Sequence, residues 1–163
     1  MIALTTSAVN LINLYAWAVL QKNTDMDTGD YGGKIPIIPG GQDPDLNAFN
    51  KPFIVYGAAE DASSDNGTVR SGTVVYAIYS DSVSEINKIQ NILVTTFEQR
   101  DVAARRINAW TSKNSAFIGI RFTSVNIAFA ESAGPADQEG GREVGTLTLR
   151  YSCVTNYAVD LNV

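Results

Sequence analysis

The sequence predicts an α+β fold: a mostly four-stranded antiparallel sheet packed by an N-terminal helix and a central pair of helices, with long polar loops and an extended arm. Residues 73–79 are β-branched and aromatic, and both alternating faces are apolar, which indicates a central strand covered on each side. Residues 144–155 alternate between apolar and polar side chains, as a strand with one wet face does. Between these strands, apolar residues at intervals of three and four predict a helix.

That helix has a clear expected start. Ser82 and Glu85 have the S-x-x-E spacing of a capping box, in which each side chain satisfies a backbone N–H of the first turn. The apolar stripe consists of Val83, Ile86, Ile89, Leu93 and Phe97, and the wet side of Asn87, Lys88, Gln90 and Asn91.

Composition indicates a single globular domain over residues 1–163. With 45% apolar residues the chain can build a core, and no linker divides it. The net charge of −5 disfavours sequence-independent nucleic-acid binding. The single cysteine, Cys153, excludes an intrachain disulfide and is expected to be buried in the last strand. Because histidine is absent, the commonest general base and metal ligand at neutral pH is missing.

Residues 5–22 form the expected N-terminal helix, which is apolar almost all round. Its apolar core is shorter than the roughly 20 residues that a bilayer requires, so no membrane association is expected. The chain also lacks the basic start of a secretory signal, since its first lysine is Lys22. We expect the helix to lie between the sheet and a second apolar surface, with another subunit as one candidate.

Residues 23–51 are expected to form a polar loop followed by an extended arm. Asp25 and Asp27 suggest a calcium loop, but an EF-hand requires glycine where Asp30 stands and glutamate where Pro36 stands. In residues 35–39, prolines exclude a central strand while three isoleucines disfavour exposure. This arm should therefore cover an apolar surface of its own domain or of a neighbour. Residues 43–49 can form a short helical turn.

Residues 52–155 supply the sheet and the helix pair. Residues 52–57 are the first strand, and residues 60–71 a polar hairpin or loop around Asn66-Gly67. Asp101 is the expected cap of the second helix. In the strand 116–130 the apolar residues change parity, which predicts a bulge near Thr123 and Ser124. Residues 131–143 form a second polar loop, and the last strand follows it.

No enzymatic or cofactor motif emerges, so we expect no catalytic residue, no cofactor and no metal. The acidic residues cluster in loops, where solvent keeps carboxyl pKa values ordinary. Arg100, Arg105 and Arg106 lack aromatic neighbours that would favour nucleic-acid binding, and are better explained as a solvated face or as ion pairs across a subunit contact. The apolar helix, the arm and the loops together favour a self-associating protein.

Several stretches resemble tail terminator (tail completion) proteins of long-tailed bacteriophages. The similarity spans roughly residues 52–153 and lies in the order of the elements and in their pattern of apolar and polar residues. The segments that carry it are Pro52-Phe53-Ile54-Val55-Tyr56, Val74-Val75-Tyr76-Ala77-Ile78 with Glu85-Ile86, the run from Arg100 to Asn108, and Gly141-Arg142 to Leu147-x-Leu149-x-Tyr151.

The resemblance implies a structural virion protein without enzymatic activity. Such a subunit forms a homo-hexameric ring on the head-proximal end of the tail tube, after assembly in the host cytoplasm. The ring ends polymerisation of the tube protein and docks the head-completion or neck protein, while DNA passes through its lumen without specific binding. Two alternatives stay open: a head–tail connector or neck protein of the same virion, and a small soluble host enzyme or ligand-binding domain, which would be a compact monomer with a deep pocket.

The ring hypothesis designates interface candidates in the arm, the polar loops and the arginine-rich helix. Deleting residues 35–39 is expected to impair ring formation while leaving the domain folded, and the two polar loops are expected to become ordered on assembly. The candidates are Ile35, Pro36, Ile37, Ile38, Pro39, Asp61, Asp65, Arg70, Arg100, Arg105, Arg106, Glu139 and Arg142.

Overall fold

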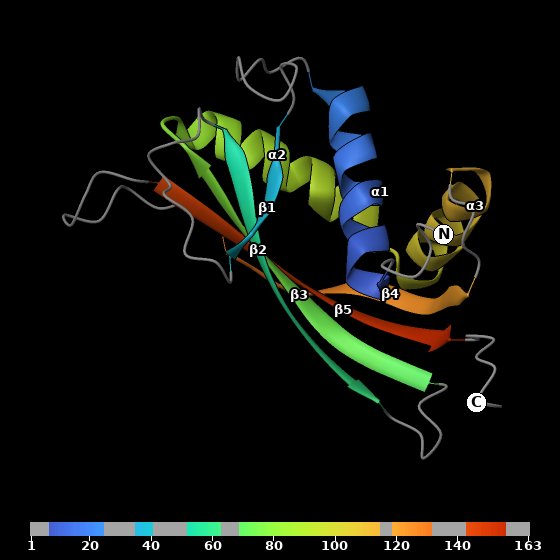
Figure 1. Cartoon of the computed structure of the whole chain (residues 1–163). Helices are drawn as coiled ribbons and strands as arrows, with labels where there is room; N and C mark the ends of the chain where they lie inside the picture. Colours follow the sequence, from blue (N-terminus) through green and yellow to red (C-terminus); the bar gives the residue numbers. More distant parts are fainter. Residues whose placement is uncertain are drawn as a thin grey trace, which may run out of the picture.

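The computed structural model has an α+β fold with three helices and a five-stranded, mostly antiparallel open sheet (Figure 1). It describes residues 7–24, 35–40, 52–62, 69–114, 119–131 and 143–155. Along the chain the elements are α1 (Ala8–Asn23), β1 (Ile37–Pro39), β2 (Phe53–Ala62), β3 (Val69–Ser80), α2 (Val83–Phe97), α3 (Arg100–Asn114), β4 (Ile120–Glu131) and β5 (Glu143–Thr155).

The strands are arranged in the order β1-β2-β3-β5-β4. β2 and β3 form a long antiparallel pair, and β5 lies antiparallel between β3 and β4. β2 runs to Ala62 and β3 starts at Val69. Residues 60–62 and 69–71 are therefore paired strand residues, which agrees with the hairpin predicted for residues 60–71 and not with the loop that was its alternative. Its turn lies outside the described residues, as do the aspartate-containing loop at residues 25–30 and the helical turn predicted at residues 43–49.

The arm forms the fifth strand, β1, which the sequence did not predict. β1 runs parallel to β2, with Ile37 opposite Ile54, and the Ile54 N–H donates a 2.9 Å hydrogen bond to the Pro36 carbonyl. Ile35 is only 1% exposed and belongs to the core. Prolines are tolerated because β1 is an edge strand. The arm thus covers its own domain, and its deletion would remove core contacts rather than leave the fold intact.

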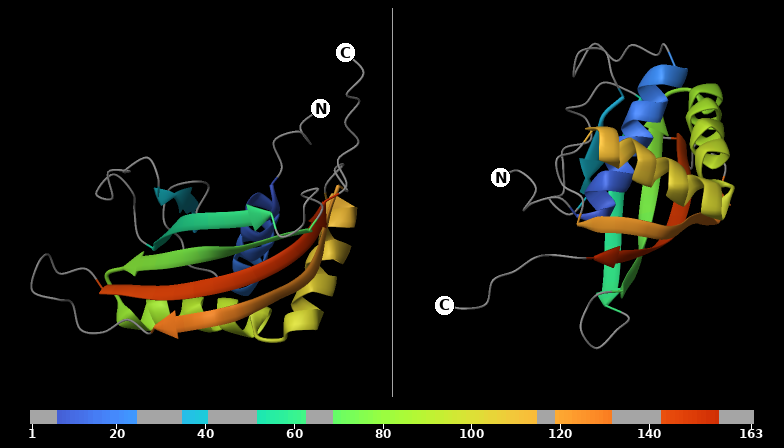
Figure 2. Two further views of the ribbon diagram at one scale, coloured as in Figure 1. Left: turned by 90° about the horizontal axis from the view of Figure 1, so that it is seen from below. Right: turned by 90° about the vertical axis from the view of Figure 1, so that its right-hand side faces the viewer.

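All three helices lie on one side of the sheet (Figure 2). α2 packs against β3, β4 and β5, while α3 packs mainly on β4 and α1 lies against α2 and α3. Val74, Tyr76 and Ile78 face this helical layer and are fully buried. No described helix covers the other face, where Val75 is 41% exposed. The expectation that the central strand is covered on both sides was therefore wrong.

The helix starts agree with the sequence only in part. Ser82 Oγ accepts a 3.4 Å hydrogen bond from the Glu85 N–H, as a capping box requires. The Ser82 N–H, however, donates to Ser80 Oγ at 3.2 Å, so Ser80 takes the place expected for the Glu85 carboxylate. α3 begins at Arg100 and the Ala103 N–H donates to the Gln99 carbonyl, which places Asp101 inside the helix rather than at its cap.

Helices α1 and α2 each contribute a buried amide side chain that is hydrogen-bonded to the sheet. On α1, Asn13 Oδ1 accepts from the Tyr76 hydroxyl at 2.5 Å. On α2, Gln90 Nε2 donates to the carbonyls of Thr146 and Glu131, at 2.8 and 2.9 Å. Gln90 is only 5% exposed, so its expected place on the wet side of the helix was wrong. Because buried amides need partners, these bonds set how each helix sits on the sheet.

Candidate functional site

The C-terminal half of β4 exposes an aromatic side chain that strand alternation would bury. The register between β4 and β5 shifts between Phe122 and Ser124, as predicted, and shifts again between Ile127 and Phe129. The second bulge was not predicted. Because one extra residue reverses the alternation, Phe129 lies opposite Thr148, on the face away from the helices, and is 58% exposed.

Phe129 belongs to a cross-strand row on this uncovered face. Thr148 pairs with Phe129 on one side and with Val75 on the other, and Val75 is 41% exposed. Two residues further along β4, Glu131 is exposed and shares the face with Phe129. The row places two exposed apolar side chains on the open side of the sheet, and Glu131, opposite Thr146 in the next row, adds a carboxylate to the same face.

A polar hollow of about 450 Å³ lies at the other end of the uncovered face. Its side chains are hydroxyls, one amide and two charged groups, so it can donate and accept hydrogen bonds. The residues that line it are Asp61, Ser71, Gly72, Thr73, Ser124, Asn126, Arg150, Tyr151 and Ser152.

Tyr151 lies at the same end of the sheet as this hollow, and its side chain is on the helical side. Its ring crosses Gly72, its partner on β3, and its hydroxyl donates to Glu60 Oε2 at 2.5 Å. Glu60 Oε1 accepts from Arg70 at 3.1 Å in an ion pair. Burial, then the hydrogen bond to Glu60, raise the pKa of Tyr151. The phenol keeps its proton at neutral pH, which favours a structural role over an acid–base one.

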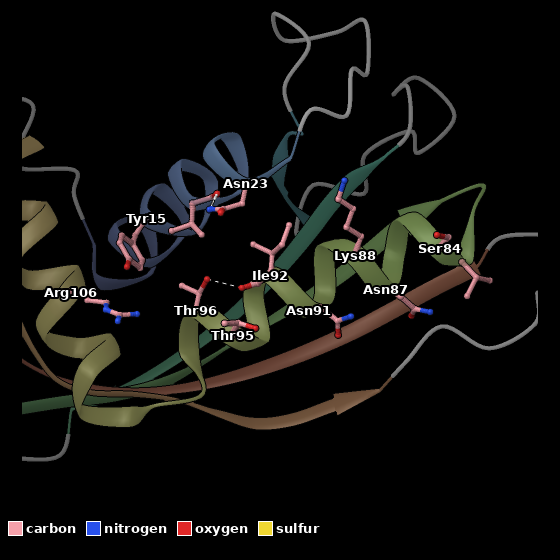
Figure 3. A pocket seen from close by; sticks show the side chains of 12 residues that line it. Tyr15, Asn23, Ser84, Asn87, Lys88, Asn91, Ile92, Thr95, Thr96 and Arg106 are labelled. Atoms are coloured by element: carbon pink, nitrogen blue, oxygen red, sulfur yellow. Dashed lines mark hydrogen bonds between the residues drawn. The ribbon is translucent and has the colours of Figure 1, made fainter.

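A groove runs over the outer surfaces of α1 and α2, with a volume of about 1000 Å³ (Figure 3). Tyr15, Val19 and Ile92 give it an apolar lining. Tyr15 is backed by edge-to-face contacts with Phe97 and Trp110, at ring-centroid distances of 6.2 and 5.9 Å. Tyr15 is thus packed against aromatic rings of α2 and α3.

The charged groups of the groove are both cationic. Of the twelve described residues that line it, only Lys88 and Arg106 carry charge, and they come from α2 and α3. Burial raises the pKa of Tyr15 while Arg106 acts in the opposite direction, as expected for a guanidinium close to the phenol. Figure 3 shows Arg106 beside Tyr15, and Lys88 further along α2 toward Ser84. The described lining of the groove is thus cationic, although the chain as a whole has a net charge of −5.

Two polar side chains of the groove donate hydrogen bonds to backbone carbonyls of their own helices. Asn23 Nδ2 donates to the Val19 carbonyl at 2.8 Å, and Thr96 Oγ1 to the Ile92 carbonyl at 2.7 Å (Figure 3). Because these donors are satisfied, an apolar group can enter without stripping them of partners.

The interface candidates predicted from the sequence do not form one cluster. Ile35 and Pro36 are buried, while Ile38 is half-buried and Pro39 exposed beside β2. Asp61 borders the polar hollow, and Arg70 is paired with Glu60. Arg106 lines the groove and Arg105 is exposed outside it. The side chain of Arg100 and all of Asp65, Glu139 and Arg142 lie outside the described residues.

Sequence reasoning missed Phe129 and the groove. The second bulge had no sequence signal, because Val125, Ile127 and Phe129 share one parity and suggest a single buried face. Groove residues such as Asn87 and Asn91 were expected to be wet, but nothing predicted how α1 crosses α2.

The described residues include no group of histidine, cysteine, aspartate or glutamate side chains that could hold a metal ion. None of the helices within those ranges is both long and apolar enough to cross a membrane. The chain matches no protein-family model and no curated protein.

Proposed function

We propose that this protein is a structural virion subunit that associates with copies of itself into a ring, and that the ring terminates a bacteriophage tail tube. The α+β architecture agrees with what the resemblance to tail terminator proteins implies. In this role the ring caps the head-proximal end of the tube, stops its polymerisation and docks the head-completion or neck protein. It works by binding alone, without a cofactor.

The observation that carries this proposal is the exposure of Phe129 by the second bulge of β4. Phe129 is 58% exposed and lies in a row with Val75, which is 41% exposed, so a partner that covers this row would gain the free energy of burying apolar surface. Bulges that redirect a side chain are a common device at functional surfaces. The row therefore supports association through the open face of the sheet.

The edges of the sheet support the same mode of association, because both resist the addition of a foreign strand. β1 is three residues long and ends in Pro39, which has no N–H to donate. On the β4 edge, Asn108 of α3 bonds to the backbone of Phe122 through its amide nitrogen and oxygen, both at 2.9 Å. The two bulges of β4 distort the rest of this edge strand. Contact through faces is then favoured over strand pairing.

The enzymatic alternative receives less support. The groove is the larger of the two described hollows, but the charged residues in its described lining are a lysine and an arginine, without a carboxylate. Its described lining therefore contains neither a histidine nor a carboxylate, the groups that most often act as general bases. The connector or neck protein of the same virion remains an alternative, because it would need the same self-association.

Electron microscopy and native mass spectrometry of the purified protein test the proposal. We expect ring-shaped particles with six-fold symmetry, and binding of these rings to one end of purified tail tubes. Rings that bind portal-bearing heads instead of tubes would favour the connector alternative. A protein that stays monomeric at every concentration, or that never binds tubes, would overturn the assignment.

A further inference from the structure

We infer that the groove between α1 and α2 receives the carboxyl end of β4, with Phe129 and Glu131, from a second copy of this chain. The inference rests on the proposed self-association and specifies which two surfaces meet. The groove is the surface described above, lined by Tyr15, Val19 and Ile92 and flanked by Arg106.

Shape and polarity favour this pairing. Phe129 is the most exposed large hydrophobic residue among those described, and the groove has an apolar lining backed by aromatic rings. Exposed aromatic side chains that enter preformed apolar pockets are the usual anchors of protein interfaces. Edge-to-face contact with Tyr15 is the geometry that aromatic pairs prefer.

Charge favours it as well. Glu131 follows Phe129 on the same face of β4, about 7 Å away, as alternate strand residues are. Arg106 lies beside Tyr15 in the groove (Figure 3). An aromatic ring seated on Tyr15 thus brings a carboxylate within reach of a guanidinium, a pairing that steers association and fixes its orientation.

The two surfaces lie on opposite sides of one subunit, since the groove belongs to the helical layer and Phe129 to the open face. A single copy cannot place its own β4 end in its own groove. When two copies join in this way, one groove and one β4 end remain unoccupied. The contact is therefore heterologous, and repeating it produces a closed ring when the rotation between copies permits.

Sedimentation velocity of the full chain tests the inference with two variants. The β4-end variant carries Phe129→Ala and Glu131→Ala; the groove variant carries Arg106→Glu and Asn91→Trp, whose indole fills the groove. Each is expected to weaken self-association by about tenfold or more, as the loss of an interface anchor does. Leu14→Ala and Arg105→Glu are matched controls, because both residues are exposed and outside the groove. They should assemble like the unaltered protein.

Mixing the two variants gives the sharpest outcome. An equimolar mixture restores one intact contact per pair, so a species of twice the 17.5 kDa monomer mass should appear that neither variant forms alone. Unchanged assembly of either variant, or no new species in the mixture, would overturn the inference. Failure of the proposed function is a separate result, in which the unaltered protein itself stays monomeric. Circular dichroism of each variant verifies that the fold is intact.

Discussion

The hydroxyl of Tyr76, in the middle of β3, donates a 2.5 Å hydrogen bond to Oδ1 of Asn13 on α1. The two residues are 63 positions apart, and both are buried. Burial raises the pKa of Tyr76, so the hydroxyl remains a donor at neutral pH. This bond connects α1 directly to the central strand, and it fixes the helix that forms one wall of the groove.

Removing the hydroxyl should therefore destabilise the fold more than the loss of one atom suggests. Tyr76→Phe leaves the buried carbonyl oxygen of Asn13 without its donor, at a cost of about 1–3 kcal/mol. The double variant Tyr76→Phe with Asn13→Leu removes both polar groups and should recover part of that loss. Urea unfolding of the two single variants and the double variant measures the coupling. Additive losses would mean that the bond contributes nothing.

Gly72 should not tolerate a side chain. A Cβ at this position would lie 2.4 Å from the Ala59 carbonyl oxygen and 2.6 Å from the Tyr151 hydroxyl. The backbone contact cannot be relieved by a rotamer change, so Gly72→Ala should cost about 1–3 kcal/mol through overpacking. Gly57→Ala is the matched control on the neighbouring strand, because its Cβ meets nothing within 4 Å. Equal denaturation midpoints for the two variants would contradict this explanation.

Asn108→Ala should release the edge of β4. The substitution removes both hydrogen bonds to the Phe122 backbone, and we expect a loss of about 1–3 kcal/mol together with faster amide exchange at Phe122. Unpaired edge groups also promote strand addition, so the variant should aggregate more readily on storage. Ser112→Ala is the control, since that exposed hydroxyl bonds only to its own helix. Unchanged exchange at Phe122 would count against the edge-capping role.

Alkaline pH should destabilise the protein by ionising buried groups. Burial raises the pKa of Cys153 from 9.0 to about 11, and the thiol is 0% exposed. Because the folded-state pKa exceeds the unfolded one, this contribution to stability is complete below pH 9 and disappears as the pH rises to 11. A pKa difference of about two units between the folded and unfolded states corresponds to about 3 kcal/mol of folding free energy. The raised pKa values of Tyr76 and Tyr151 extend the loss above pH 10.

Chemical denaturation at several pH values checks this prediction. Cys153→Ala should show a shallower decline in the free energy of unfolding between pH 9 and 11 than the unaltered protein, while their difference stays constant from pH 7 to 8.5. The thiol should also resist alkylation in the folded state below pH 9. Identical slopes for both proteins would exclude Cys153 as a source of the decline.

Local signals predicted much of the fold. The periodicity of residues 83–97 predicted α2 to within a residue, the alternation of residues 144–155 predicted β5 and the burial of Cys153, and the parity change in β4 predicted its first bulge. These features depend on side-chain spacing along one element, which a sequence displays directly. The site was predicted far less well, because the residues that form it come from elements far apart in the chain.

By itself, the sequence determined the α+β class, the order of the helices and the four long strands, and the absence of the usual catalytic motifs. The tertiary structure alone decided that residues 37–39 pair in parallel with β2, that the helices cover only one face, and that a second bulge turns Phe129 outward. Spacing along the chain records which residues share a face, whereas pairing register and the crossing of helices depend on contacts between distant segments, and those contacts arise only on folding.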